Sequence, residues 1–258
     1  VYVAWQDNLD PTPTADILFT ASSDDGATFN GGTAGNAGTP KDLSSTNIAS
    51  PDTNDSFHPQ VAAAGGKAYV VWDDVSGGNR EIFYRNSTDV GVTFGPTLSS
   101  SATVLSTSGG NNEVEPQIGT NSDGSKVFVT WNENTSDDIK FKRSTNSGVT
   151  FTAIQDIDTA GTDTLPALDS LGDNVYIAWK DSGTGAGDIF YTSSSDGGAT
   201  FANKQNISND VTPSSFPQLD SASSHIVWVD QPSGFKNILI KSGVFGLDLS
   251  WNQTNYKI

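Results

Sequence analysis

The sequence has no cysteine and no methionine, and only two histidines and 13 basic residues among 258. Without cysteine there are no disulfides, no thiol catalysis and no cysteine-ligated metals. The basic residues are outnumbered by 30 acidic ones, mostly aspartate, which gives a net charge of −17. Nucleic acids and anionic membranes require basic surfaces, and no apolar run approaches the roughly 18 residues of a membrane span. We therefore expect no nucleic acid partner and no membrane insertion, whereas cations, carbohydrates and proteins stay open.

Strong helix formers are also scarce. Glycine, serine, threonine and asparagine are abundant along the whole chain. These residues favour turns and strand edges. A length of 258 residues suits one all-β domain and is enough to bury a core. The composition therefore predicts an all-β fold and argues against helical bundles and α/β folds.

An internal repeat organises the chain. An aliphatic and aromatic run that ends in tryptophan recurs at residues 1–5, 68–72, 127–131, 175–179 and 225–228. A second apolar segment follows each run, at residues 17–19, 82–84, 139–141, 189–191 and 238–240. A proline-containing segment precedes four of the runs, with its proline at Pro59, Pro116, Pro166 and Pro217. Such runs between turn-forming clusters predict strands, and proline fits the start of a strand.

The motif S-x-[D/N]-x-G-x-T-F follows the second apolar segment in four repeats. Its acid or amide can accept backbone hydrogen bonds and close a turn, its glycine supplies a left-handed backbone, and its phenylalanine can pack on a neighbouring sheet. A worn fifth copy runs over residues 242–251. The four good copies contain Ser22, Asp24, Gly26, Phe29, Ser87, Asp89, Gly91, Phe94, Ser144, Asn146, Gly148, Phe151, Ser194, Asp196, Gly198 and Phe201.

This motif resembles the Asp-box, or BNR, repeat of sialidase-like β-propellers, and the resemblance covers nearly the whole chain. It implies a β-propeller of about five four-stranded blades, or five blades of a truncated six-bladed ring, in one domain over residues 1–258. The repeats span roughly residues 1–52, 53–110, 111–160, 161–210 and 211–258. The resemblance also places the boxes away from the ligand face, so we interpret them as structural and not catalytic.

We expect the first blade to lack its inner strand, because the given sequence starts at the second strand of that repeat. An incomplete blade edge is a template for strand addition, so a homo-oligomer or a surface filament is one predicted assembly. The polar stretches at residues 30–57 and 95–114 are predicted to be connections between blades.

Acidic residues gather where the resemblance places the ligand face, in the loops between second and third strands. They could cap their own turns, bind a divalent cation such as Ca²⁺, or grip sugar hydroxyls and act catalytically. One set follows the tryptophan runs and comprises Asp7, Asp74, Glu133, Asp181 and Asp230. The other precedes the third strands and comprises Asp16, Glu81, Asp138 and Asp188.

Further candidates lie outside these pairs. His58 and Glu115 would start two inner strands on the same face, and Arg80 lies beside Glu81. Asp156 and Asp158 stand at alternate positions before Gly161, and Asp163 follows it. This spacing loosely resembles a calcium-binding loop. The same residues also fit an acidic, solvated connection. No cofactor is required by any motif, and Ca²⁺ is the ion these acids would favour.

A sialidase needs three arginines to clamp the substrate carboxylate. The chain has three in all, and two of them, Arg85 and Arg143, fall in third strands close to the boxes. The sequence therefore favours a non-catalytic module, secreted or at a cell surface, that binds a glycan or a protein. A sialidase-like glycoside hydrolase completed by a further N-terminal part, and an assembly subunit that uses strand complementation, are the alternatives.

Overall fold

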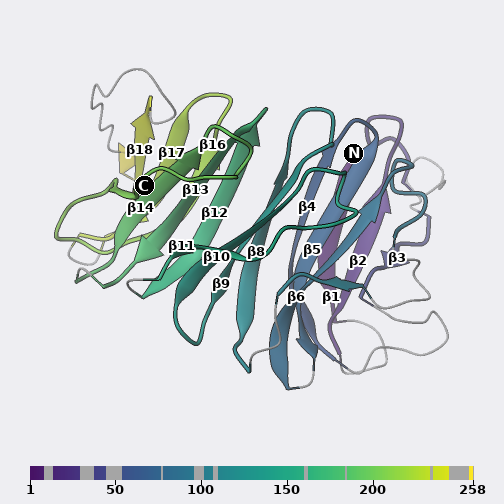
Figure 1. Ribbon diagram of the computed structural model, residues 1–258, viewed down its shortest axis with the longest axis horizontal. Helices are drawn as coiled ribbons and strands as arrows, with labels where there is room; N and C mark the ends of the chain where they lie inside the picture. Colours follow the sequence, from purple (N-terminus) through teal and green to yellow (C-terminus); the bar gives the residue numbers. More distant parts are fainter. Residues whose placement is uncertain are drawn as a thin grey trace. The chain divides into compact units, whose positions relative to one another are not determined.

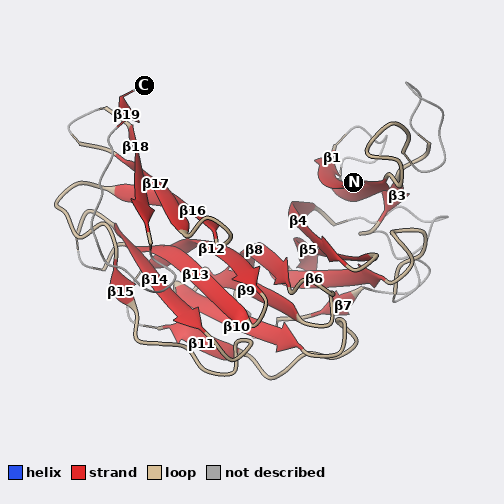
Figure 2. Cartoon of the chain, turned by 90° about the horizontal axis from the view of Figure 1, so that it is seen from above, coloured by secondary structure: helices blue, strands red, loops and turns tan. Residues whose placement is uncertain are grey.

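The computed structural model describes residues 1–8, 14–29, 38–44, 54–76, 78–95, 102–106, 110–159, 162–183, 185–232, 235–243 and 256–257. These residues form strands and turns, and Figure 2 draws no helix among them. In this part of the chain no helix is long and apolar enough to cross a membrane. The prediction of an all-β chain is confirmed.

The strands group into five sheets in which neighbours along the chain are also neighbours in the sheet (Figure 1). The first sheet contains β1 (Tyr2–Asp7), β2 (Asp16–Ala21) and β3 (Lys41–Asp42), and the second β4 (Ser56–Ala64), β5 (Lys67–Ser76), β6 (Asn79–Ser87) and β7 (Thr103–Val104). The third contains β8 (Glu113–Thr120), β9 (Val127–Glu133), β10 (Asp138–Ser144) and β11 (Gln155–Asp158). The fourth contains β12 (Asp163–Leu171), β13 (Asn174–Asp181), β14 (Asp188–Ser194) and β15 (Gln205–Asn206), and the fifth β16 (Ser214–Asp220), β17 (His225–Asp230), β18 (Asn237–Ser242) and β19 (Tyr256–Lys257).

Each four-stranded sheet follows the order that the repeat predicts. The proline-containing segment is its first strand, the tryptophan run its second and the following apolar segment its third. In the described residues the first sheet has three strands and begins with the tryptophan run β1, so the prediction that this blade lacks its inner strand is confirmed. The worn turn at residues 242–251 lies largely outside the described residues.

The sequence predicts a fourth, outer strand in each blade but does not locate it. Strands β3 and β7 lie inside the polar stretches 30–57 and 95–114, which the sequence assigns to connections alone. Each has two residues and pairs with its third strand over two positions. A strand that short carries no alternation of apolar and polar residues, so its pattern does not distinguish it from a loop.

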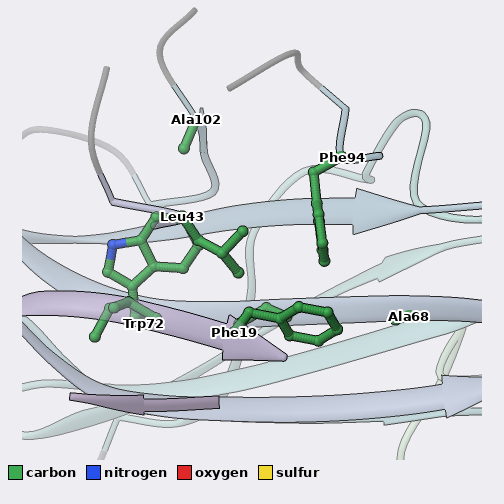
Figure 3. Close-up of a cluster of buried hydrophobic side chains, with 8 residues drawn as sticks. Phe19, Leu43, Ala68, Trp72, Phe94 and Ala102 are labelled. Atoms are coloured by element: carbon green, nitrogen blue, oxygen red, sulfur yellow. The ribbon is translucent and has the colours of Figure 1, made fainter. Parts of the chain in front are cut away.

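The chain divides into two compact units, Val1–Val127 with Ser144–Phe151, and Phe128–Arg143 with Thr152–Ile258. In the first unit the first and second sheets share a core that contains Phe19, Leu43, Trp72 and Phe94 (Figure 3). In the second unit two further cores join strands of the third and fourth sheets and of the fourth and fifth sheets. The expectation of one domain over residues 1–258 stays a prediction.

The tryptophan strands are apolar on both faces because both faces are covered. Residues 68–72 of β5 are all fully buried. In β13, residues 175–179 are at most 5% exposed. Burial of a large side chain stabilises a fold by about 1.5–3 kcal/mol, so these strands supply much of the core of each unit.

Candidate functional site

The repeated turns are closed by a serine together with an acid, or with Asn146 in the third copy. In the second repeat the Ser87 hydroxyl accepts a hydrogen bond from the Gly91 N–H at 2.8 Å and donates to the Asp89 carboxylate at 2.8 Å. The same Asp89 oxygen also accepts from the Thr93 backbone N–H at 2.8 Å, and the second oxygen accepts from the Thr93 hydroxyl at 2.6 Å. The same contacts recur in the first and fourth turns, so both carboxylate oxygens are occupied within the turn.

These contacts favour the charged form of the acid. Hydrogen bonds from the threonine that follows, chiefly from its side chain, lower the pKa of Asp24 and of Asp89 to about 2. The Thr200 N–H and hydroxyl lower the pKa of Asp196 in the same way. Asn146 keeps the turn without a charge, because its amide NH₂ donates to the Thr150 hydroxyl at 2.9 Å while its oxygen accepts from the Thr150 N–H.

The turns of the second, third and fourth repeats also anchor the sheet before them. The ring of Phe94 meets the ring of Phe19 edge to face, with centroids 4.8 Å apart. Figure 3 shows the Phe94 ring edge-on, above the Phe19 ring. Phe151 meets Tyr84, and Phe201 meets Phe141, at 5.0 Å in both cases. These edge-to-face contacts add to the burial of the rings themselves.

The turn glycine is required for two reasons. Gly91 has φ +83, which side-chain-bearing residues resist, and a Cβ there would lie 2.8 Å from the Phe19 ring. Gly198 has φ +75, and its Cβ would lie 2.7 Å from Phe141. The turns therefore act in packing between sheets.

The acids at the hairpin bases lie directly opposite one another. The structure pairs Asp7 with Asp16, Asp74 with Glu81, and Asp181 with Asp188 across neighbouring strands, and it pairs Asp230 with Asn237. Like charges in such positions repel, so each pair needs compensating donors.

Hydroxyl groups supply most of those donors. Just after the outer strands β3, β7 and β15, a serine hydroxyl accepts the N–H of the isoleucine near the start of the third strand and bonds the acid beside it. On or just before two of the first strands, a hydroxyl donates to the acid that stands two residues after the tryptophan. These pairs are Ser44–Asp16 (3.4 Å), Ser106–Glu81, Ser208–Asp188 (3.0 Å), Ser56–Asp74 (2.6 Å) and Thr212–Asp230. The arrangement fits a role in closing strand ends.

The third repeat uses a lysine in place of a hydroxyl. The ammonium of Lys140 bonds Glu133 at 3.1 Å, Asp138 at 2.9 Å and Asp156 at 2.8 Å. Burial opposes its charge, but the three carboxylates together raise the pKa of Lys140 well above its ordinary value. Asp156, which the sequence groups with Asp158, is thus held by this lysine.

A strained position recurs in four inner strands, immediately before the proline. His58, Glu115, Leu165 and Phe216 have φ between 51 and 55, in the left-handed region. In β4, β12 and β16 the pairing register shifts at the same point. A left-handed backbone costs a residue with a side chain roughly 1–2 kcal/mol, and the sequence suggested His58 and Glu115 but missed the two apolar members. The signal that could have found them is the shared place before proline.

His58 belongs to a polar cluster in the first unit. Its Nδ1 lies 2.7 Å from the Asp73 carboxylate, which is fully buried and also accepts from the Arg80 guanidinium at 3.1 Å. The hydrogen bond to Asp73 raises the pKa of His58, and Glu115 acts in the same direction. The Arg80 guanidinium lies 4.0 Å above the Phe57 ring. This cluster offers donors and a half-exposed imidazole to a ligand.

The other two arginines are engaged elsewhere. Arg85 is fully buried and donates to the Leu43 carbonyl at 2.7 Å. Arg143 donates to the Gly197 carbonyl at 2.9 Å, in the turn of the fourth repeat. Neither guanidinium is placed to clamp a substrate carboxylate.

Three buried carboxylates meet in the second unit. Asp158 at the end of β11, Asp163 at the start of β12 and Asp181 at the end of β13 each offer an oxygen within 4.8 Å of the other two. Their exposed fractions are 7%, 0% and 2%. The ammonium of Lys204 bonds Asp158 and lies 3.7 Å from Asp181.

Asp163 differs from every acid of the repeated turns. Neither of its oxygens accepts a hydrogen bond from an N–H or O–H group of the described residues, and Asp158 could donate to it only by carrying a proton itself. Burial, with the charges of Asp158 and Asp181, raises the pKa of Asp163 to about 8.

The repeats explain how the cluster arises. Asp158 occupies the fourth-strand position that is Ser44, Ser106 or Ser208 elsewhere, and Asp163 occupies the first-strand position, three before proline, that is Ser56 or Ser214. Acids have replaced two hydroxyl donors beside Asp181. The predicted triad of Asp156, Asp158 and Asp163 included two of these residues. The pairing register shifts between Ile139 and Lys140, so Asp156 goes to Lys140 instead.

No family model matches the sequence, and no curated protein matches it. Solved structures do match. The endosialidase of phage phi92 has a TM-score of 0.61 at 11% identity, over 100% of this chain and 55% of that one. The K499G mutant of NanB sialidase from Streptococcus pneumoniae has a TM-score of 0.54 at 16% identity, over 85% and 33%. TolB from Acinetobacter baumannii has a TM-score of 0.52 at 12% identity, over 95% and 51%.

The chain spans about half or less of the length of these three proteins, and at such identities the likeness shows the fold alone. With its five sheets and these neighbours, the protein has an all-β, sialidase-like β-propeller fold.

Proposed function

We propose that this chain is a non-catalytic β-propeller module of the Asp-box type, secreted or displayed at a cell surface, that binds a glycan or a protein through the bulges of its inner strands. The observation that carries the proposal is the strained position before proline. Glycine or asparagine would occupy a left-handed backbone with less strain. The chain instead has four large side chains of different chemistry there, and the Phe216 side chain is 55% exposed. Backbone strain of this kind concentrates at functional sites.

The four side chains suit recognition more than chemistry. In the first unit His58 and Glu115 stand beside Arg80, a set that can hydrogen bond hydroxyls or peptide groups. In the second unit Leu165 and Phe216 present apolar surface, which suits a sugar face or an apolar side chain. The arginines engaged by carbonyls in the core and the turns argue against a sialidase clamp.

The test is binding to arrays of glycans and of extracellular protein domains. Asparagine tolerates the left-handed region, so each unit is tested by its own variant. His58→Asn and Phe216→Asn should fold as well as the wild type, and at least one of them should lose about tenfold or more in affinity for the ligand found. Val149→Asn is the matched control, because Val149 is 73% exposed and lies in a repeated turn of the third repeat. Unchanged binding by both bulge variants, or turnover of a fluorogenic sialoside by the wild type, would contradict the proposal.

A further inference from the structure

The carboxylate cluster of Asp158, Asp163 and Asp181 has a charge deficit. Three buried acids are accompanied by one ammonium, that of Lys204, whose side chain is 33% exposed. If all three acids are ionised, the cluster has a net charge of −2. Burial of uncompensated charge costs several kcal/mol, and one divalent cation would remove the deficit.

Carboxylate oxygens of Asp181 and Asp163 are available to a cation. Asp181 uses one oxygen to accept the Gly183 N–H at 2.7 Å and keeps the other oxygen on the side of Lys204. Asp163 is fully buried, and both of its oxygens are without a donor among the described residues. A buried carboxylate without a donor calls for a proton or a metal ion.

The spacing of the three carboxylates fits a calcium ion. Two oxygens bound to one ion can be no farther apart than twice the metal–oxygen distance. For Ca²⁺, at 2.3–2.6 Å, this limit is about 4.6–5.2 Å, and for Mg²⁺, at 2.0–2.1 Å, it is about 4.0–4.2 Å. The three oxygens lie within 4.8 Å of one another, a separation that one Ca²⁺ can span without rearrangement. All-oxygen ligation also suits this hard cation.

We propose that Asp158, Asp163 and Asp181 bind one Ca²⁺ ion. The ion would tie the outer strand β11 of the third sheet to β12 and β13 of the fourth sheet, within the second unit. It would replace the hydroxyl bonds that Ser56 and Ser208 make at the same positions of other repeats. This structural role is independent of the ligand-binding function proposed above.

The repeats themselves supply the test variants. Asp163→Ser and Asp158→Ser install the residues that neighbouring repeats carry at these positions, and Asp163→Asn keeps the shape of the side chain while it removes the charge. Asp156→Ser is the matched control, because Asp156 belongs to the sequence pattern but lies with Lys140 outside the cluster.

The experiment measures melting temperature and terbium luminescence of EDTA-stripped protein with added Ca²⁺ or Mg²⁺. At 100 times the dissociation constant, Ca²⁺ should raise the melting temperature of the wild type and of Asp156→Ser by about 5–10 °C. Asp163→Ser, Asp163→Asn and Asp158→Ser should show no shift and no tryptophan-sensitised terbium signal. A wild type without a Ca²⁺ shift, a shift that survives in Asp163→Ser, or a shift given by Mg²⁺ but not by Ca²⁺ would overturn the proposal.

Discussion

The repeated turns and the carboxylate cluster use the same residue type in opposite ways. In the turn, Asp89 is surrounded by donors from Ser87 and Thr93, and its pKa falls to about 2. In the cluster, Asp163 is buried beside two other acids, and its pKa rises to about 8. The same chain thus contains aspartates, such as Asp89, whose negative charge is stabilised by hydrogen bonds, and Asp163, whose negative charge is not.

The difference lies in the neighbouring residues and not in the backbone. An acid stands two residues after the tryptophan in all five second strands, and a hydroxyl donates a hydrogen bond to that acid at Asp74 and at Asp230. At Asp181 the expected hydroxyl is replaced by Asp163, and Asp158, at a position that is serine in other repeats, lies beside both. A repeat protein can therefore convert a structural position into a binding site by exchanging donors for acceptors while the fold stays the same.

The largest expected effect comes from removing a buried phenylalanine ring of a repeated turn. Phe94→Ala removes a ring that is 4% exposed and lies in the core between the first two sheets. We expect a loss of about 3–5 kcal/mol in the free energy of unfolding, measured by denaturant titration. Val92→Ala in the same turn is the control, because Val92 is 65% exposed and should change stability by less than about 0.5 kcal/mol. Equal effects of the two would show that the turn does not anchor the neighbouring sheet.

The next effect is a gain in stability, from a substitution in the carboxylate cluster. Without divalent cations, Asp163→Ser should stabilise the protein by about 1–3 kcal/mol, because it removes a buried carboxylate that has no donor. Denaturant titration in EDTA measures this gain. Asp74→Ser, at an acid whose Ser56 donor is in place, should destabilise instead. A loss of stability in Asp163→Ser would mean that the cluster is already satisfied without an ion.

A smaller effect is expected within the turns. Asp89→Ala removes the acceptor for the Thr93 N–H and hydroxyl and should cost about 1–2 kcal/mol. Asp89→Asn should cost less than about 0.5 kcal/mol, because Asn146 makes the same contacts in the third turn. Chemical denaturation at pH 7 compares the two. If asparagine costs as much as alanine, the charge and not the hydrogen bonds closes the turn.

The smallest effect is on acid sensitivity. The folded-state pKa of Asp89 is about 2, below its ordinary value of 3.8. A lowered acid pKa stabilises the fold above the ordinary value, and this stabilisation is lost as pH falls through the folded value. Between pH 5 and pH 2 the melting temperature of the wild type should therefore fall slightly more than that of Asp89→Asn. Parallel pH profiles of the two proteins would show that the Asp89 charge does not contribute to stability against acid.

Much of the fold could be predicted from the sequence because its signals are local and repeated. The tryptophan runs, the prolines and the serine-to-phenylalanine turns each mark one element, and the first sheet starts where the pattern starts. The two-residue outer strands β3 and β7 could not be located from the sequence, since they carry no pattern.

The candidate sites were only partly predictable because they combine distant strands. Asp158 and Asp163 are close in sequence, but Asp181 joins them only through the pairing of β12 with β13, which sets Asp163 opposite Asp181. Asp156 is diverted by a register shift that no spacing reveals. Asp73, the buried partner of His58, was missed because the position after tryptophan differs in every repeat.

The most direct measurement is an anomalous difference map from a crystal of the stripped protein soaked in terbium, a calcium analogue. The account predicts a strong peak bounded by Asp158, Asp163 and Asp181, and none at Asp24, Asp89 or Asp196. A peak at the turn acids with none at Asp163 would contradict the claim that hydroxyl and amide donors decide which of these aspartates binds an ion.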